Sequence, residues 1–438
     1  MCALCFAVGE DKQDKLVLHE WGTFISLQDE EGKAISGINT DDEPVPKFVH
    51  RLSWNNLLSE NDEHPKWSQG AVYCHPDVTM RLETPVIYFH PSEKWRSQPV
   101  KVHVAFRGGW LTEFYPDAIF QVPGFDATKP KEIFSNEAGE KQDEYMEFGH
   151  IKTDAAGELS WKKLTVGTNG TGPNTTEKVW LAPRDVKAAT VQTARSEREK
   201  FLFYRGVGNV DAPLRIARND ANKTLEVRDN HRGLAMLDPD DNLRIHAAWL
   251  VDFRPDGACA FKSVGEVKWG KEIRAVVPAS FNTDDFSPKN MPRLQDEMRK
   301  ALITDGLFAD EADALLKTWQ VSYFKSPGLR FFYLCPRADI ENTLPLEISV
   351  PCIVTRVMIG RIELVTPGQR VLLKEISTAL PPRWIDSWED VKKSAGFAAY
   401  VKLGRFRNAL ILDEQKRRPP PTLKDFIKNN NFEAYKIE

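Results

Sequence analysis

LVLHEWGTFISL, residues 16–27, is rich in β-branched, aromatic and aliphatic side chains, the composition of a strand inside a sheet. Alternate residues of a strand point to opposite faces, so the adjacent His19 and Glu20 face apart. Glu20 shares its face with the apolar Leu18 and Phe24. A carboxylate among apolar side chains needs a cationic partner or a proton. The sequence therefore predicts that Glu20 belongs either to a buried Glu–Arg pair that fixes the sheet or to a functional site.

Apolar runs of strand length recur along most of the chain. Residues 80–116 read as three successive strands, and short strands punctuated by Gly, Asn and Asp follow over residues 201–277. Apolar residues at helical spacing predict two amphipathic helices, at 290–305 and 310–321, and a helical stretch at 385–412. Together these patterns predict an α+β protein: a large antiparallel β-sandwich with a helical pair and a helical C-terminal segment.

The changes of pattern divide the chain into four segments. Residues 1–15 form a leader, 16–280 a β-sandwich domain, 281–380 the helical pair with returning strands, and 381–438 the helical C-terminal segment. The leader begins MCALCFAVG and then turns polar, like the end of a secretory signal peptide that lacks its basic region. A truncated signal peptide predicts a periplasmic or secreted protein, whereas a plain apolar N-terminus predicts a cytoplasmic one.

Composition and cysteine spacing exclude several classes of partner. A net charge of −4 and a pI near 6.2 offer no broad basic surface for nucleic acid. No run approaches the roughly 20 apolar residues that span a bilayer, so we expect no transmembrane segment. Cys2 and Cys5 form a CxxC without a second pair or nearby histidines to complete a zinc site. For Cys335 and Cys352, in two strand-like runs, a disulfide and free thiols are both open.

The nine histidines show no spacing typical of a metal site, such as the HExxH of a helix. A three-ligand site for a divalent metal could still be assembled in space from His19, His50 and His75. Glu83 lies beside aromatic residues on the same face of a strand as Arg81. We therefore take His19, Glu20 and Glu83 as the candidate catalytic residues.

A second set of residues has the chemistry of ligand binding. Tyr204 and Arg205 end a strand before Gly206-Val-Gly, which fits either a close approach of the backbone to a ligand or a bulge. Arg330 is one of several arginines in the late strands that can pair with carboxylates or hold an anion. The candidate ligand-binding residues are Trp21, His50, Tyr204, Arg205 and Arg330.

Five strings are the most distinctive parts of the chain: HEWGTF (19–24), RLETPVIYF (81–89), FLFYRGVGN (201–209), GLRFFYLCPR (328–337) and RVMIGRIELVTP (356–367). They resemble those of an uncharacterised family of bacterial secreted or periplasmic proteins with a signal peptide. The resemblance spans the chain from residue 16 to about 370 and implies export. It implies no activity and no residue roles, and the chain departs from the family in its short N-terminus.

Two functions follow as hypotheses. The first is an extracytoplasmic hydrolase that acts through a carboxylate and histidine site, in which Glu20, Glu83 and early histidines converge in a cleft. The second is a non-catalytic binding or scaffold protein of the cell envelope, in which those carboxylates are locked in pairs with arginines. The fold class favours neither hypothesis, because one fold hosts many functions.

Overall fold

The computed structural model describes residues 15–39, 45–51, 67–68, 71–72, 74–123, 150–230, 244–267, 273–321, 324, 326–379 and 395–417. The leader, including Cys2 and Cys5, lies outside the described residues apart from Lys15. So does the first part of the helical stretch expected at 385–412.

The strands, in chain order, are β1 (Leu16–Gln28), β2 (His50–Arg51), β3 (Trp67–Ser68), β4 (Ala71–Val72), β5 (Met80–His90), β6 (Val100–Arg107), β7 (Gly109–Tyr115), β8 (Ile119–Gln121), β9 (Ala156–Val166), β10 (Val191–Gln192), β11 (Arg198–Glu199), β12 (Phe201–Gly208), β13 (Leu214–Asn219), β14 (Thr224–Asp229), β15 (Ala248–Phe253), β16 (Cys259–Ser263), β17 (Ile273–Pro278), β18 (Gly328–Leu334), β19 (Leu346–Ile348) and β20 (Cys352–Leu364). The helices are α2 (Lys178–Arg184), the 3₁₀ turn η3 (Thr283–Asp285), α3 (Asn290–Thr304), α4 (Ala309–Val321), α5 (Arg337–Thr343), α6 (Pro367–Ala379), α8 (Ala395–Lys402) and α9 (Arg407–Arg417).

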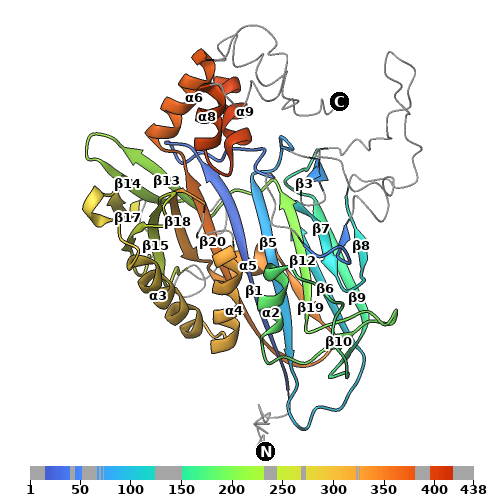
Figure 1. The fold of residues 1–438 in the computed structure, drawn as a ribbon. Helices are drawn as coiled ribbons and strands as arrows, with labels where there is room; N and C mark the ends of the chain where they lie inside the picture. Colours follow the sequence, from blue (N-terminus) through green and yellow to red (C-terminus); the bar gives the residue numbers. More distant parts are fainter. Residues whose placement is uncertain are drawn as a thin grey trace, which may run out of the picture.

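One large sheet organises the molecule, and β1 lies at its centre between β5 and β20. Across the sheet the strand order is β11-β10-β9-β7-β12-β5-β1-β20-β18-β15-β16. β1 runs antiparallel to β5 but parallel to β20, so the sheet is mixed rather than wholly antiparallel as the sequence predicted. The α+β class is confirmed, because helices cover this sheet as separate groups (Figure 1).

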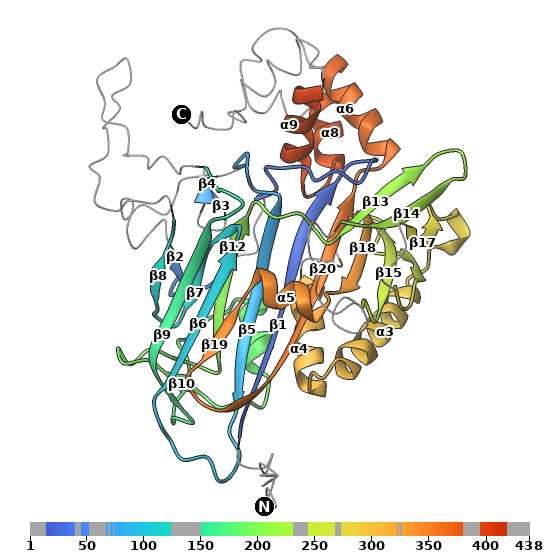
Figure 2. The same cartoon turned by 180° about the vertical axis from the view of Figure 1, so that it is seen from behind.

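The two faces of the sheet are covered by different layers. One face packs against α2, α3 and α4, which lie in front of the strands, with α6, α8 and α9 at one end (Figure 1). On the other face, strands β6, β9 and β19, which belong to the same hydrogen-bonded sheet, and helix α5 lie in front of the central strands, whereas the small sheet β13-β14-β17 lies toward β18 and β15 (Figure 2). Because both faces are covered, β1 is buried along nearly its whole length, including its polar residues.

The helical pair is confirmed close to its expected bounds, since α3 and α4 cover residues 290–304 and 309–321. The C-terminal part is helical where it is described, and α8 and α9 are separated near Gly404, whose φ of 88° interrupts a helix. Helix α6 was not expected from the sequence. In the described part of the chain, no helix is both long and apolar enough to cross a membrane.

The boundary expected at residue 280 does not divide the sheet. β18 and β20 come from the segment 281–380, yet they lie between β1 and β15 of the preceding segment. The later chain therefore completes the core of the earlier chain. Cys335 and Cys352 are free thiols in this structure, so the alternative with a disulfide is not observed.

Ion pairs between opposite residues link the central strands. Glu20 of β1 lies opposite Arg356 of β20, and Arg330 of β18 lies opposite Glu363 of β20. The Arg330 and Glu363 side chains are 3.2 Å apart, and Glu363 also pairs with Arg361. Opposite charges in facing positions fix strand register, because a slip of one residue would leave each charge buried without its partner.

We expect stability to fall in acid through Glu363. Burial raises the pKa of Glu363, but the charges of Arg330 and Arg361 outweigh burial and leave the pKa below its ordinary value of 4.5. This stabilisation is complete above the unfolded pKa and is lost as pH falls toward the folded one. In Glu363→Gln, the free energy of unfolding should be lower at pH 7 and should change less steeply below about pH 4.5. Urea titrations at several pH values measure both quantities, and an unchanged slope would contradict the assignment.

Candidate functional site

Two histidines meet on the helical face of the sheet. His19 of β1 lies opposite Tyr88 of β5, so His90, two residues further along β5, is its diagonal neighbour on the same face. The centroids of the two imidazole rings are 5.3 Å apart. Strand pairing therefore brings together two residues that are 71 positions apart in the sequence.

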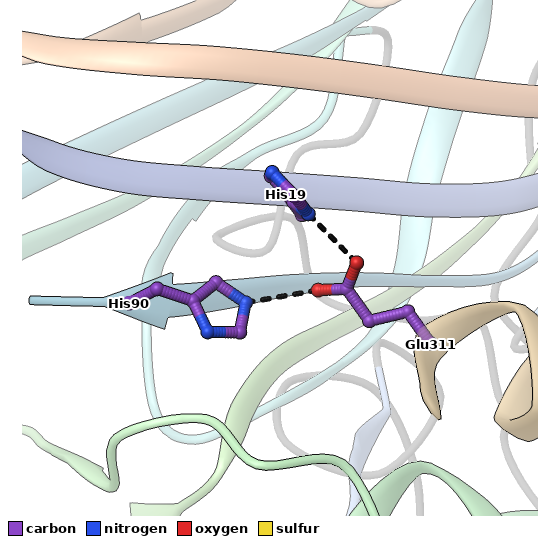
Figure 3. A group of neighbouring side chains, drawn as sticks. All are labelled: His19, His90 and Glu311. Atoms are coloured by element: carbon purple, nitrogen blue, oxygen red, sulfur yellow. Dashed lines mark hydrogen bonds and ion pairs between the residues drawn. The ribbon is translucent and has the colours of Figure 1, made fainter. Parts of the chain in front are cut away.

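Glu311 of α4 joins the two histidines from the helical layer (Figure 3). One carboxylate oxygen is 2.7 Å from Nδ1 of His19, and the other is 2.9 Å from Nε2 of His90. The side chain of Glu311 is fully buried, and that of His90 is 14% exposed. Glu311 thus connects strands β1 and β5 to the first turn of α4.

The local sequence explains why Glu311 points to this place. It is the third residue of α4, where a glutamate often reaches back to the backbone at the start of its helix. The backbone N–H of Phe308 donates to Glu311 at 2.8 Å. Burial raises the pKa of Glu311, but hydrogen bonds from His19 and His90 outweigh it, and the net pKa is lowered. The site therefore favours an ionised carboxylate.

The aromatic ring of Phe308 contacts both imidazole rings. Its ring centroid lies 4.4 Å from that of His19 and 4.9 Å from that of His90. The side chain is itself 46% exposed, so one part of it contacts the histidines while the rest meets solvent. Phe308 is thus part of the cover between the histidines and the surface.

The three residues offer the donor atoms of a metal site. One ligand atom from each of His19, His90 and Glu311 lies within 4.8 Å of the others. Among the described residues, no other group of three potential ligands has this geometry. Two imidazoles and one carboxylate are a set that holds zinc in hydrolases and iron(II) in oxygenases, with positions left for water or substrate. Without a metal, the same atoms form a hydrogen-bonded triad centred on Glu311.

The structure separates the three histidines that were expected to form a metal site. His50 bonds to Glu197 at 2.9 Å, and its ring stacks on Phe114. His75 is buried and accepts a hydrogen bond from the backbone of Asp77. His19 instead meets His90 and Glu311, because the fold pairs its strand with the end of β5.

Glu20 lies on the opposite face of β1 from His19, as the strand alternation predicted. It accepts a hydrogen bond from the Tyr204 hydroxyl and a charged one from Nε of Arg356 at 2.5 Å. Burial and the nearby Glu20 hold the pKa of Tyr204 well above its ordinary value, so the hydroxyl stays a donor. The carboxylate is completely buried, and its charge is balanced by Arg356 while the Tyr204 hydroxyl donates a further hydrogen bond.

Glu83 is also removed from the histidines. It pairs with Arg81 at 2.6 Å and with Arg405 at 3.2 Å. Seven residues separate Glu83 from His90 in β5, which is about 23 Å along an extended strand. The structure thus brings His19 to the candidate site but leaves both catalytic carboxylates expected from the sequence outside it.

The expected ligand-binding residues are distributed through the core. Trp21 is buried against Tyr88, with ring centroids 6.3 Å apart. Arg205 is buried with Glu113, at 3.5 Å, and Arg330 is buried with Glu363. Each of these side chains is therefore buried within the protein.

His90 and Glu311 were missed because each has an ordinary local context. His90 ends a strand before Pro91, and Glu311 looks like a capping residue of a helix. The signal that would have revealed His90 is the antiparallel pairing of β1 with β5, which sets it beside His19, whereas Glu311 depends on how α4 packs on the sheet. That pairing is not readable from either strand alone.

Comparisons with known proteins assign no family. No family model matches the chain, and no curated protein matches it. Among solved structures, one that matches is the Fcho1 Mu homology domain of Danio rerio with bound Eps15 peptide, at 7% sequence identity. The match covers 81% of this chain and 97% of that one, with a TM-score of 0.25. A similarity this low supports no conclusion about function.

A double-mutant cycle tests the pair that neutralises Glu20. We expect Arg356→Met to lower the free energy of unfolding by about 3–5 kcal/mol, because it leaves a buried carboxylate without its cation. The double variant Glu20→Gln with Arg356→Met should recover part of that loss. The control is Arg337→Met, which breaks the exposed Arg337–Glu341 pair and should cost about 0.5 kcal/mol or less. Additive effects of the two central substitutions would refute a direct interaction.

Phe308 should limit access to the histidines. In Phe308→Ala we expect faster modification of His19 and His90 by diethyl pyrocarbonate, measured by peptide mass spectrometry, because the ring that covers them is removed. The exposed His246 gives the reference rate in the same sample. Ile119→Ala, which removes another exposed apolar side chain, is the matched control and should leave both rates unchanged. Equal rates in all three proteins would show that Phe308 covers nothing.

Proposed function

We propose that the protein is a hydrolase whose catalytic centre is a divalent metal held by His19, His90 and Glu311, and that it acts outside the cytoplasm. The observation that supports this proposal is the convergence of three metal-ligating side chains from β1, β5 and α4 within 4.8 Å. Two histidines and one glutamate are the ligands of hydrolytic zinc sites, which keep a further position for water. The sequence resemblance, which implies export, supports the location.

The surroundings suit such a centre. A bound divalent cation lowers the pKa of its water toward 7 and so supplies hydroxide near neutral pH. Glu311 is fully buried, and low-dielectric surroundings strengthen the attraction between a carboxylate and a cation. His90 is the most exposed of the three ligands and therefore marks the side from which substrate would approach, next to Phe308.

The opposite face of the sheet has a different role in this proposal. We infer that β6, β9 and β19 form the second layer of a β-sandwich over the central strands, since their apolar residues join one core with those of β1, β5 and β18. That layer closes the face that carries Glu20. The centre thus lies on the face covered by helices, where α4 contributes a ligand.

A second candidate function is a non-catalytic binding or scaffold protein of the cell envelope. The observation in its favour is that the buried carboxylates Glu20 and Glu83 are each paired with arginines. In that case Glu311 is a structural tie between α4 and the sheet, because it accepts hydrogen bonds from both histidines at once. The two functions differ in whether the triad takes up a metal.

Elemental analysis of untagged protein decides between them. We expect roughly one zinc per chain in the wild type and a metal affinity at least about tenfold weaker in His90→Ala and Glu311→Gln. His246→Ala removes another histidine that is bonded to a carboxylate, Asp305, and should keep the metal. Hydrolysis of nitrophenyl esters should require the metal and rise with pH through about 7, because a divalent metal held by these three residues would lower the pKa of a bound water toward that value.

Two results would overturn the hydrolase proposal. Absence of metal at saturating zinc, together with a thermal midpoint that chelator does not change, would leave the triad as a structural tie. Stoichiometric iron(II) without hydrolysis would assign the same ligands to oxidative chemistry.

A further inference from the structure

A cavity of about 360 Å³ lies at the opposite end of β1 from His19. It is lined by the end of β1, the loop after it, the start of β13 and Asn230 after β14. Its volume is within the range of small-molecule sites. Gln28 in its wall follows His19 by nine residues, which is about 30 Å along the strand, so this cavity is separate from the candidate metal centre.

The floor of the cavity is preformed. The amide of Gln28 donates to the backbone of Leu214 at 2.7 Å and accepts from the backbone of Ile216 at 3.0 Å. Gly32 has a φ of 75°, and a Cβ there would come within 2.9 Å of the Ile216 nitrogen. The loop can therefore approach β13 this closely only with glycine at that position.

The outer side of the same loop is held by the C-terminal helices. Glu30 forms a two-point ion pair with Arg370 of α6, at 2.7 and 2.9 Å. Asp29 accepts hydrogen bonds from the backbone of Glu31 and Lys33 and pairs with Arg417 of α9. The wall of the cavity is thus ordered before any ligand arrives, which lowers the entropy cost of binding.

Three charged residues line this cavity. Arg215 and Lys33 are cations, and Asp211 is the one carboxylate in the lining. Among the described residues, Arg215 donates two long hydrogen bonds, at 3.4 Å, to the carbonyls of Gly32 and Glu31. Within the described residues, the side chains of Lys33 and Asp211 form no ion pair with the protein. The charge pattern of the lining is therefore two cations and one anion.

We propose that this cavity binds a small acidic amino acid. Its two carboxylates match Lys33 and Arg215, and its ammonium group matches Asp211, so each ligand charge gains a charge-assisted hydrogen bond. A dicarboxylate without the ammonium leaves Asp211 next to like charge, and a basic amino acid places a second cation near Arg215. This site is independent of the proposed hydrolase function.

Calorimetric titration of the full chain at low salt tests the proposal. L-glutamate and L-aspartate should bind with a Kd below about 1 mM, whereas succinate and L-lysine should bind at least about tenfold more weakly. Lys33→Ala and Asp211→Asn should each weaken glutamate binding about tenfold, because each removes one charged contact. Lys163→Ala, on the exposed face of β9, is the matched control and should bind as the wild type does.

The results that would contradict this proposal differ from those that would contradict the metal centre. No binding of either acidic amino acid would overturn the proposal, and so would equal affinity in the wild type and Lys33→Ala. Succinate binding as tightly as glutamate would overturn the role of Asp211. His90→Ala should retain glutamate binding, so loss of metal there leaves this test unaffected.

Discussion

The burial of β1 on both faces is the constraint on which the rest of the structure depends. A strand with no exposed face can carry an ionisable side chain only if another element supplies a partner for it. β1 carries two adjacent ones, His19 and Glu20, which alternation sends to opposite layers. Each of the two side chains therefore needs a specific partner, which is supplied either by another strand of the sheet or by a covering helix.

On one side the partners are strands. Arg356 reaches Glu20 from the facing position of β20, and Tyr204 reaches it from β12. Glu363 and Arg330 form a second buried ion pair between facing residues, on β20 and β18. Buried ion pairs of this kind add little net stability compared with apolar packing, because desolvation offsets most of their attraction. Their main consequence is that alternative registers of the central strands are strongly disfavoured.

On the other side the partner is a helix. Glu311 extends from the first turn of α4 to His19 and His90, so the position of the helix and the geometry of the triad are set together. The same rigidity is what a metal centre needs, since ligands fixed by packing and hydrogen bonds hold a cation without reorganising. A structural tie and a metal site thus share one geometry and differ in whether the ligand atoms hold protons or a metal.

The sequence alone determined the strand-rich α+β class, the helical pair at 290–321 and the opposite orientation of His19 and Glu20, because these follow from local periodicity. It also required that Glu20 be neutralised, although it did not name Arg356. Only the tertiary structure decided that β20 runs parallel beside β1 and that β5 sets His90 next to His19. It also placed Glu311 against both His19 and His90. Pairing between residues 56 to 336 positions apart depends on how whole layers pack, and no short stretch of sequence contains that information.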